Sequence, residues 1–209
     1  DFTALTELDC GRNELTALDV SNNTALDELH CNSNQLTVLD VSANTALTEL
    51  YCGSNQLTVL DVSNNNLYRM VCSSNQLTSL DVTNNTELIQ LYCYTNQLTT
   101  LDVSSNTALN SLRCHENQLT VLDVSANTAI TTLYCNGNEL IHLNMKNGVN
   151  VALTTFDATD NSLTCIEVNE EDVDWATENW TYENGNIDEG VEFSVVCVPE
   201  GYTYVPDNN

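Results

Sequence analysis

Cysteine recurs along most of this chain at a nearly constant interval. Seven cysteines are separated by 21, 21, 20, 21, 21 and 21 residues, at Cys10, Cys31, Cys52, Cys72, Cys93, Cys114 and Cys135. The one shorter interval contains Asn64–Leu67, where neighbouring copies read Asn-Thr-Ala-Leu. A unit of this length cannot bury its apolar side alone, so a fixed period of about 20–50 residues indicates repeats that stack on one another.

Each repeat contains two short segments in which apolar and polar residues alternate, as in Leu91-Tyr92-Cys93 and Leu101-Asp102-Val103. Alternation with a period of two predicts a strand with one buried face, and no repeat has the spacing of a three-turn helix. Two strands and two bends make one coil, and coils stacked about 4.8 Å apart form two parallel sheets. The predicted fold class is therefore mainly β: a helix-poor solenoid of seven coils with two parallel sheets and a C-terminal cap.

Two files of asparagine mark the bends. One file follows each cysteine by three residues, and the other lies four residues after a repeated aspartate, beginning at Asn13 and Asn23 respectively. A carboxamide carries both donors and acceptors, so an inward asparagine can satisfy the bend backbone and bond the next asparagine in its file. Asparagine also tolerates the left-handed backbone that tight bends need.

The repeat Leu-x-x-Leu-x-Cys-x-x-Asn-x-Leu-Thr-x-Leu-Asp-Val-Ser-x-Asn-Thr-x resembles a leucine-rich repeat. More narrowly, it is similar to the nested 21-residue (IRREKO-type) class found in secreted and surface proteins of Bacteroidetes-type bacteria. The resemblance covers residues 2–146, and Phe156–Ile166 with Trp180 resembles the C-terminal end of such proteins. It implies a non-catalytic module for extracellular recognition or adhesion within a larger protein.

The period predicts two domains. Residues 1–146 form the leucine-rich-repeat array, and residues 147–209, which contain no Lys or Arg, form an acidic cap. Because Phe2–Leu8 aligns with Asn44–Leu50, the array is expected to be truncated at its N-terminus, with Phe2 as a minimal lid in the alternative. Within the cap we expect a short helix from near Asp172 and a strand at Ser194–Val198.

The nine cysteines divide into seven and two. The seven in register are expected to be buried, reduced thiols that act as small apolar groups. Cys165 and Cys197 lie outside that file beside apolar residues, and we predict that they form a disulfide. A disulfide indicates an oxidising compartment, hence a secreted or cell-surface protein. In the alternative, all nine are reduced and the protein is cytosolic.

The outward residues next to the cysteines vary among copies, whereas the core and the bends barely change. The candidate ligand-binding residues on this face are His30, Tyr51, Tyr92, Tyr94, Arg113, His115 and Tyr134. Because Tyr51, Tyr92 and Tyr134 lie two coils apart, or about 10 Å, their rings could stack on alternate sugars of a polysaccharide. They could equally anchor a protein ligand, or simply reflect the strand propensity of tyrosine.

A file of outward carboxylates occupies the other predicted sheet: Asp19, Asp40, Asp61, Asp81, Asp102 and Asp123. Adjacent members about 4.8 Å apart repel one another, and either water and salt or bridging Ca²⁺ could relieve the repulsion. Glu170, Glu171, Asp172 and Asp174 make a second candidate calcium site in the cap. No cofactor is otherwise required.

Charge and motifs narrow the function. The formal net charge of −26 argues against nucleic acid and anionic membrane surfaces as partners. No run of about 18 apolar residues occurs, so direct membrane insertion is not expected. The three histidines are far apart, and a glycosidase-like pair of Glu28 and Glu49 would stand on an open sheet, so we expect no enzyme. We predict a monomer that binds a protein or polysaccharide, with a rigid structural spacer as the alternative.

Overall fold

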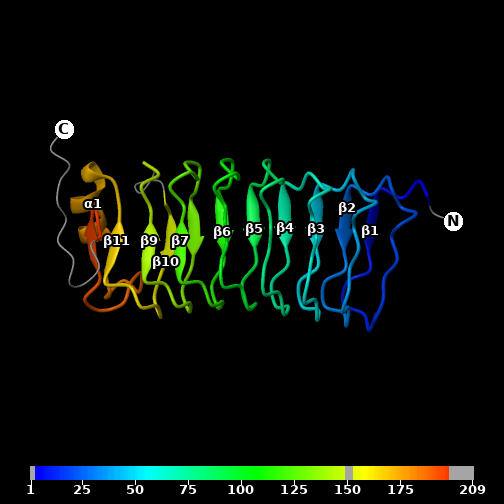
Figure 1. The fold of residues 1–209 in the computed structure, drawn as a ribbon, viewed down its shortest axis with the longest axis horizontal. Helices are drawn as coiled ribbons and strands as arrows, with labels where there is room; N and C mark the ends of the chain where they lie inside the picture. Colours follow the sequence, from blue (N-terminus) through cyan, green and yellow to red (C-terminus); the bar gives the residue numbers. More distant parts are fainter. Residues whose placement is uncertain (1–2, 149–152, 198–209) are drawn as a thin grey trace.

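The computed structural model describes residues 3–148 and 153–197. The chain winds into a row of coils along the long axis of the molecule (Figure 1). One side of the row is a parallel sheet of eight three-residue strands in the order β1-β2-β3-β4-β5-β6-β8-β10. These strands are β1 (Glu7–Asp9), β2 (Glu28–His30), β3 (Glu49–Tyr51), β4 (Arg69–Val71), β5 (Gln90–Tyr92), β6 (Ser111–Arg113), β8 (Thr132–Tyr134) and β10 (Thr155–Asp157).

Strand pairing keeps equivalent residues of successive copies side by side. Leu29 pairs with Leu50, and Leu91 pairs with Leu112. The central residue of β2, β3 and β5 is fully buried, and its two neighbours are half-buried. The 20-residue interval does not disturb this register, because Glu49 still pairs with Arg69. The predicted solenoid with its straight files of side chains is therefore confirmed.

The second side of the coils is less regular than the alternation predicted. Its sheet has four strands, in the order β12-β11-β9-β7: β7 (Val121–Asp123), β9 (His142–Asn144), β11 (Cys165–Glu167) and β12 (Glu192–Ser194). In an earlier coil, the Ser42 N–H donates to Asp40 Oδ1 at 2.9 Å and the Asn44 N–H donates to the Val41 carbonyl at 3.0 Å. The corresponding bonds of Ser125 and Asn127 follow strand β7, so they form the turn after this side of each coil whether or not the side pairs as a strand.

Asparagine side chains hold the bend that follows each β-strand of the long sheet. In the third coil, Asn55 Nδ2 donates to the carbonyls of Cys31 and Cys52, both at 3.0 Å. Its Oδ1 accepts the N–H of Leu36, also at 3.0 Å. One buried carboxamide thus satisfies three backbone groups and ties its own coil to the preceding one.

Two details of the bends differ from the sequence expectation. In the second file, Asn65 Nδ2 donates at 2.8 Å to the backbone carbonyl of Asn44, not to its carboxamide. The left-handed backbone falls on the residue before the first-file asparagine, as at Ser54 and Thr95, where φ is 56° and 53°. Asparagine secures the bend by hydrogen bonding, while its neighbour takes the unfavourable dihedral angle.

The seven cysteines in register are free thiols, and all except Cys10 are fully buried. Burial raises the pKa of Cys31 and of Cys72 to about 12. A thiol with so high a pKa is a poor nucleophile at neutral pH, so these side chains act as apolar core groups, as predicted.

The coil pattern continues beyond residue 146. β10 pairs in register with β8, placing Phe156 beside Leu133, and β11 pairs with β9. The 3-10 helix η2 (Glu170–Asp172) and helix α1 (Val173–Asn179) follow, close to the predicted helix start. Whether residues 147–209 form a separate domain stays a prediction.

Aromatic packing and a disulfide close the C-terminal end. The Trp180 ring lies 4.7 Å from the Phe156 ring and 5.8 Å from the Phe193 ring, between centroids. The predicted bond between Cys165 and Cys197 is present, and it joins β11 to the segment after β12. In the part of the chain described, no helix is long and apolar enough to span a bilayer.

The strand predicted at Ser194–Val198 is wrong in position. β12 ends at Ser194, because Phe193 is the residue that pairs with Ile166 in the core. Beyond it the chain bends, and Ser194 Oγ accepts the N–H of Val196 at 3.4 Å. Val198, like Phe2, lies outside the described residues.

Candidate recognition face

The outward side chains of the eight-stranded sheet form three files. The first and second files contain the first and third residues of each strand, and the third file contains the residue two positions after the strand. We call these three files together the recognition face. The pairing His30–Tyr51, Tyr92–Arg113 and Arg113–Tyr134 places five of the predicted residues in one file. Tyr94 and His115 lie two residues further along their coils, in the adjacent file. All seven candidate residues therefore lie on the same side of the molecule, as the repeat predicted.

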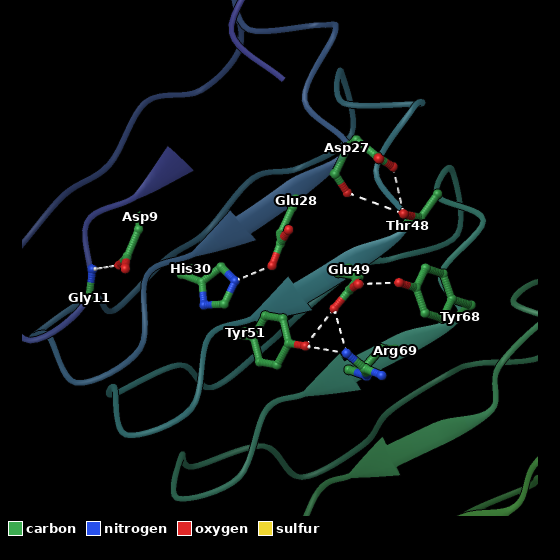
Figure 2. A network of polar contacts seen from close by, with 10 residues as sticks. All are labelled: Asp9, Gly11, Asp27, Glu28, His30, Thr48, Glu49, Tyr51, Tyr68 and Arg69. Carbon is green, nitrogen blue, oxygen red and sulfur yellow. Dashed lines mark hydrogen bonds and ion pairs between the residues drawn. The ribbon is translucent and has the colours of Figure 1, made fainter. Parts of the chain in front are cut away.

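In the N-terminal half of this face, Glu49 is the centre of a polar network (Figure 2). The hydroxyls of Tyr51 and Tyr68 both donate to its carboxylate. Arg69 Nη1 lies 3.0 Å from Glu49 Oε2 and donates to the Tyr51 hydroxyl at 3.0 Å. Burial alone would raise the pKa of Glu49, but the hydrogen bonds from Tyr51, Tyr68 and Arg69 outweigh it and lower the pKa below its ordinary value.

This lowered pKa gives a testable pH dependence. A carboxyl whose pKa is depressed by folding stabilises the protein above its ordinary pKa of 4.5, and the contribution disappears as the pH falls through the folded-state pKa. Glu49→Gln should therefore lower the melting temperature at pH 7, and the difference from wild type should shrink as the pH falls below 4. Glu7→Gln, an exposed position in the same file, is the matched control. A constant difference across that pH range would contradict the assignment.

His30 belongs to the same half of the face. Its ring stacks on Tyr51 with 4.2 Å between centroids and 18° between planes. Its Nε2 lies 2.5 Å from Glu28 Oε1. The outward ionisable groups of β2, β3 and β4 are thus largely satisfied by one another.

The C-terminal half of the face is different, because its charge is unpaired. The Arg113 guanidinium carbon lies 4.7 Å from the centroid of Tyr92 and 5.2 Å from that of Tyr134. Among the described residues, Arg113 has no ion pair, and its buried Nε has no hydrogen-bond partner. His115 stacks on Tyr94 at 4.4 Å, and burial lowers its pKa, so it is neutral at pH 7. Two tyrosines therefore hold one unneutralised cation in place.

The rings are not arranged as the spacing of the tyrosines suggested. The near-parallel stacking of His30 on Tyr51 and of Tyr94 on His115 joins neighbouring coils, so the ring planes lie across the solenoid axis. Tyr92 and Tyr134 turn a ring face toward Arg113. Ring edges and hydroxyls, more than flat ring faces, are consequently turned to solvent. This arrangement differs from open platforms for alternate sugars, and polysaccharide binding by these rings stays a prediction.

Neither half offers a catalytic arrangement. Glu28 and Glu49 are register neighbours, but hydrogen bonds from Tyr51 and Tyr68 and an ion pair with Arg69 engage Glu49 as a carboxylate of lowered pKa. A glycosidase acid needs the opposite, a raised pKa in an enclosed site. His142 lies on the other sheet, 3.4 Å from Glu167.

The repeated aspartates have a structural role in their turns. Oδ1 of each accepts the N–H of the residue two positions later, as from Asp61 to Ser63 at 2.9 Å and from Asp81 to Thr83 at 3.0 Å. These hydrogen bonds lower the pKa of both carboxyls. The described residues contain no group of three or more His, Cys, Asp or Glu placed to hold a metal ion. Calcium bridging between neighbours stays a prediction, which melting temperatures in EDTA and in millimolar Ca²⁺ would test.

Sequence reasoning missed the network around Glu49. It placed Glu49 on the open sheet beside Glu28 but connected it with neither Arg69 nor Tyr68. Tyr68 directly follows the shortened bend at Asn64–Leu67, and its backbone N–H donates to the Thr48 carbonyl at 2.9 Å. The sequence feature that could have predicted this network is the opposite charge of Glu49 and Arg69 at equivalent positions of adjacent copies.

Comparison with known proteins identifies the fold to which this face belongs. The family model described as the LVIVD repeat matches residues 31–52 and 50–73. No curated protein matches the chain. The leucine-rich-repeat protein LIC12759 of Leptospira interrogans superposes with a TM-score of 0.69 at 20% identity, covering 92% of this chain and 49% of that one. The fold is a leucine-rich-repeat solenoid.

Two further solved leucine-rich-repeat structures are similar. The functional domain of InlJ from Listeria monocytogenes, which includes a cysteine ladder, is 38% identical with a TM-score of 0.61, over 79% of this chain and 44% of that one. The plant peptide hormone receptor RGFR1, solved in complex with RGF2, is 24% identical with a TM-score of 0.68, over 79% of this chain and 30% of that one. The chain therefore spans less than half the length of each of these proteins.

Proposed function

We propose that this leucine-rich-repeat solenoid is a non-catalytic module that binds a protein ligand through its recognition face. The observation that carries the proposal is the cluster of Arg113 with Tyr92 and Tyr134, an unpaired cation between two aromatic rings on a half-exposed sheet. Tyrosine and arginine are the residues most enriched at the energetic centres of protein interfaces. The receptor RGFR1, of the same fold, was solved with RGF2 bound.

A protein ligand fits the face better than a neutral polysaccharide does. Sugar binding by aromatic residues uses an exposed ring face, and the rings here stack along the solenoid. Their outward edges and hydroxyls suit hydrogen bonds and side-chain packing. Adhesion to a glycan remains an outcome that a glycan array would detect.

The setting that we propose is extracellular. The disulfide between Cys165 and Cys197 favours an oxidising compartment. The resemblance to the 21-residue class of secreted and surface proteins of Bacteroidetes-type bacteria supports the same setting. We propose that the module acts as a monomer within a larger secreted or surface protein.

The test compares two triple variants in a pull-down from extracellular proteins. Tyr51→Ala/Tyr92→Ala/Tyr134→Ala should reduce capture of any specific partner at least about tenfold, since each interface tyrosine contributes on the order of 1 kcal/mol or more. The matched control replaces exposed apolar residues at equivalent positions on the other side of the coils, Val38→Thr/Val59→Thr/Val121→Thr. Both variants must keep the circular dichroism spectrum of wild type. Equal capture by wild type and the tyrosine variant would favour the rigid spacer instead.

A further inference from the structure

The recognition face is divided electrostatically into two halves. The first file of side chains begins with the carboxylates Glu7, Glu28 and Glu49 and, after Arg69, continues with the neutral residues Gln90, Ser111 and Thr132. In the N-terminal half, the one arginine on a strand, Arg69, is neutralised by Glu49. In the C-terminal half, the one arginine on a strand is Arg113, which has no carboxylate partner among the described residues.

The carboxylates nearest this second half are engaged elsewhere. Asp157, which pairs with Tyr134 in the next strand, accepts the N–H and hydroxyl of Thr159 at 3.0 and 2.7 Å. Glu116 accepts the Thr95 hydroxyl at 2.6 Å. Among the arginines of the described residues, only Arg69 forms an ion pair, and Arg113 differs from the likewise unpaired Arg12 in its contacts with two tyrosine rings.

The contacts of Arg113 with two tyrosine rings restrict the kind of group that its guanidinium can bind. Tyr92 and Tyr134 lie on either side of the guanidinium group along the file, which restricts it to few orientations and reduces the entropy lost on binding. A planar guanidinium matches a carboxylate, which it can bind through two parallel hydrogen bonds. Because the protein as a whole is strongly negative, long-range repulsion disfavours polyanions such as acidic polysaccharides and nucleic acids.

We propose that the recognition face binds an extended peptide segment of a protein partner, with one carboxylate of that segment seated on Arg113 and a basic residue over the acidic N-terminal half. Glu28 and Ser111 are four coils apart in the same file, which is about 19 Å at about 4.8 Å per coil. An extended chain advances about 3.3 Å per residue, so the basic and acidic residues of the ligand are about six positions apart. This inference rests on the proposed function and defines the ligand chemistry of the same face.

An array of synthetic eight-residue peptides tests the proposal directly. Each peptide has Lys at its first position, Glu or Gln at its seventh, and Gly, Ser or Tyr elsewhere, so that every Glu peptide has a Gln counterpart. The wild-type protein should bind its best Glu peptides about tenfold more tightly than their counterparts, the effect of a charged hydrogen-bonded pair. Arg113→Gln should abolish the difference, and Arg113→Lys, which cannot form two parallel bonds, should reduce it.

The matched control is Arg12→Asn, which removes an equal charge from an exposed position where φ is 56°, a backbone that asparagine tolerates. It should keep the preference for Glu. A wild-type protein that binds Glu and Gln peptides equally, or binds none, overturns the proposal, as does tighter binding of an oligogalacturonate. If tyrosine substitution abolishes partner capture while Arg113→Gln leaves it unchanged, only this inference fails. If tyrosine substitution has no effect, the proposed function fails as well.

Discussion

Asn55→Ala should destabilise the solenoid by about 3–5 kcal/mol, although it removes only one polar side chain. The substitution leaves the buried N–H of Leu36 without its acceptor. It also removes one of the two asparagine donors from each of the carbonyls of Cys31 and Cys52, which keep Asn34 and Asn75 respectively. An unsatisfied buried N–H costs about 1–3 kcal/mol and each lost hydrogen bond about 0.5–1.5 kcal/mol, and water cannot easily enter to replace the carboxamide. Urea denaturation followed by circular dichroism would measure the loss.

Asn13→Ala provides a control within the same file. Asn13 makes equivalent bonds to the carbonyls of Cys10 and Gly11, but at an exposed position of the first coil. Water can take over these bonds, so the expected loss is below about 1 kcal/mol. Equal losses at the two positions would show that the buried carboxamide is not what holds the bends.

Removal of the disulfide should have the second largest effect, and the effect should be local. The bond closes a loop with a sequence separation of 32 residues, for which the chain-entropy argument gives about 3–4 kcal/mol. Cys165→Ala/Cys197→Ala should lower the protection of α1 and β12 against hydrogen exchange. The central coils should be unaffected, because each coil of a solenoid contacts only its neighbours. Hydrogen exchange with mass spectrometry resolves the two regions.

Treatment with a reductant is the control for the Cys165→Ala/Cys197→Ala variant. Dithiothreitol should reproduce its exchange pattern in wild type and should not change the variant further, because the seven remaining cysteines are already free thiols. A further change in the variant would mean that thiols in the file also form bonds. Uniform loss of protection along all coils would mean that the disulfide stabilises the whole array, which the nearest-neighbour argument does not allow.

The sequence predicted the long sheet better than the second one. In the Leu-x-Cys segments, alternation and stacking agree, so residues such as Leu50 and Leu91 are buried in register as expected. In the Leu-Asp-Val segments the same alternation is present, but the side chain of Asp40 bonds the backbone of Ser42. The Ser125 N–H makes the same bond to Asp123 Oδ1 beside strand β7, so this contact accompanies strand and turn alike. Alternation of residue types does not distinguish the coils that pair on this side from those that do not.

The sequence predicted which residues lie on the candidate site but not which of their side chains contact one another. Period and alternation placed Tyr51, Tyr92 and Arg113 on one face, because those depend on the backbone alone. Which side chain contacts which depends on rotamers. The hydrogen bond from Tyr51 to Glu49 and the packing of Arg113 between two rings required coordinates. The division of the face into an acidic half whose arginine is ion-paired and a half with an unpaired arginine follows from those contacts.

The coil that is one residue short has an evolutionary consequence. Its missing residue is absorbed in the bend at Asn64–Leu67, while the pairing of Glu49 with Arg69 across it stays in register. A lineage can therefore trim or extend that bend, or gain and lose whole coils by recombination between near-identical copies, without disturbing neighbouring strands. Each coil gained or lost between the two halves would move the Arg113 cluster by one coil relative to the acidic half, and so alter ligand preference in discrete steps.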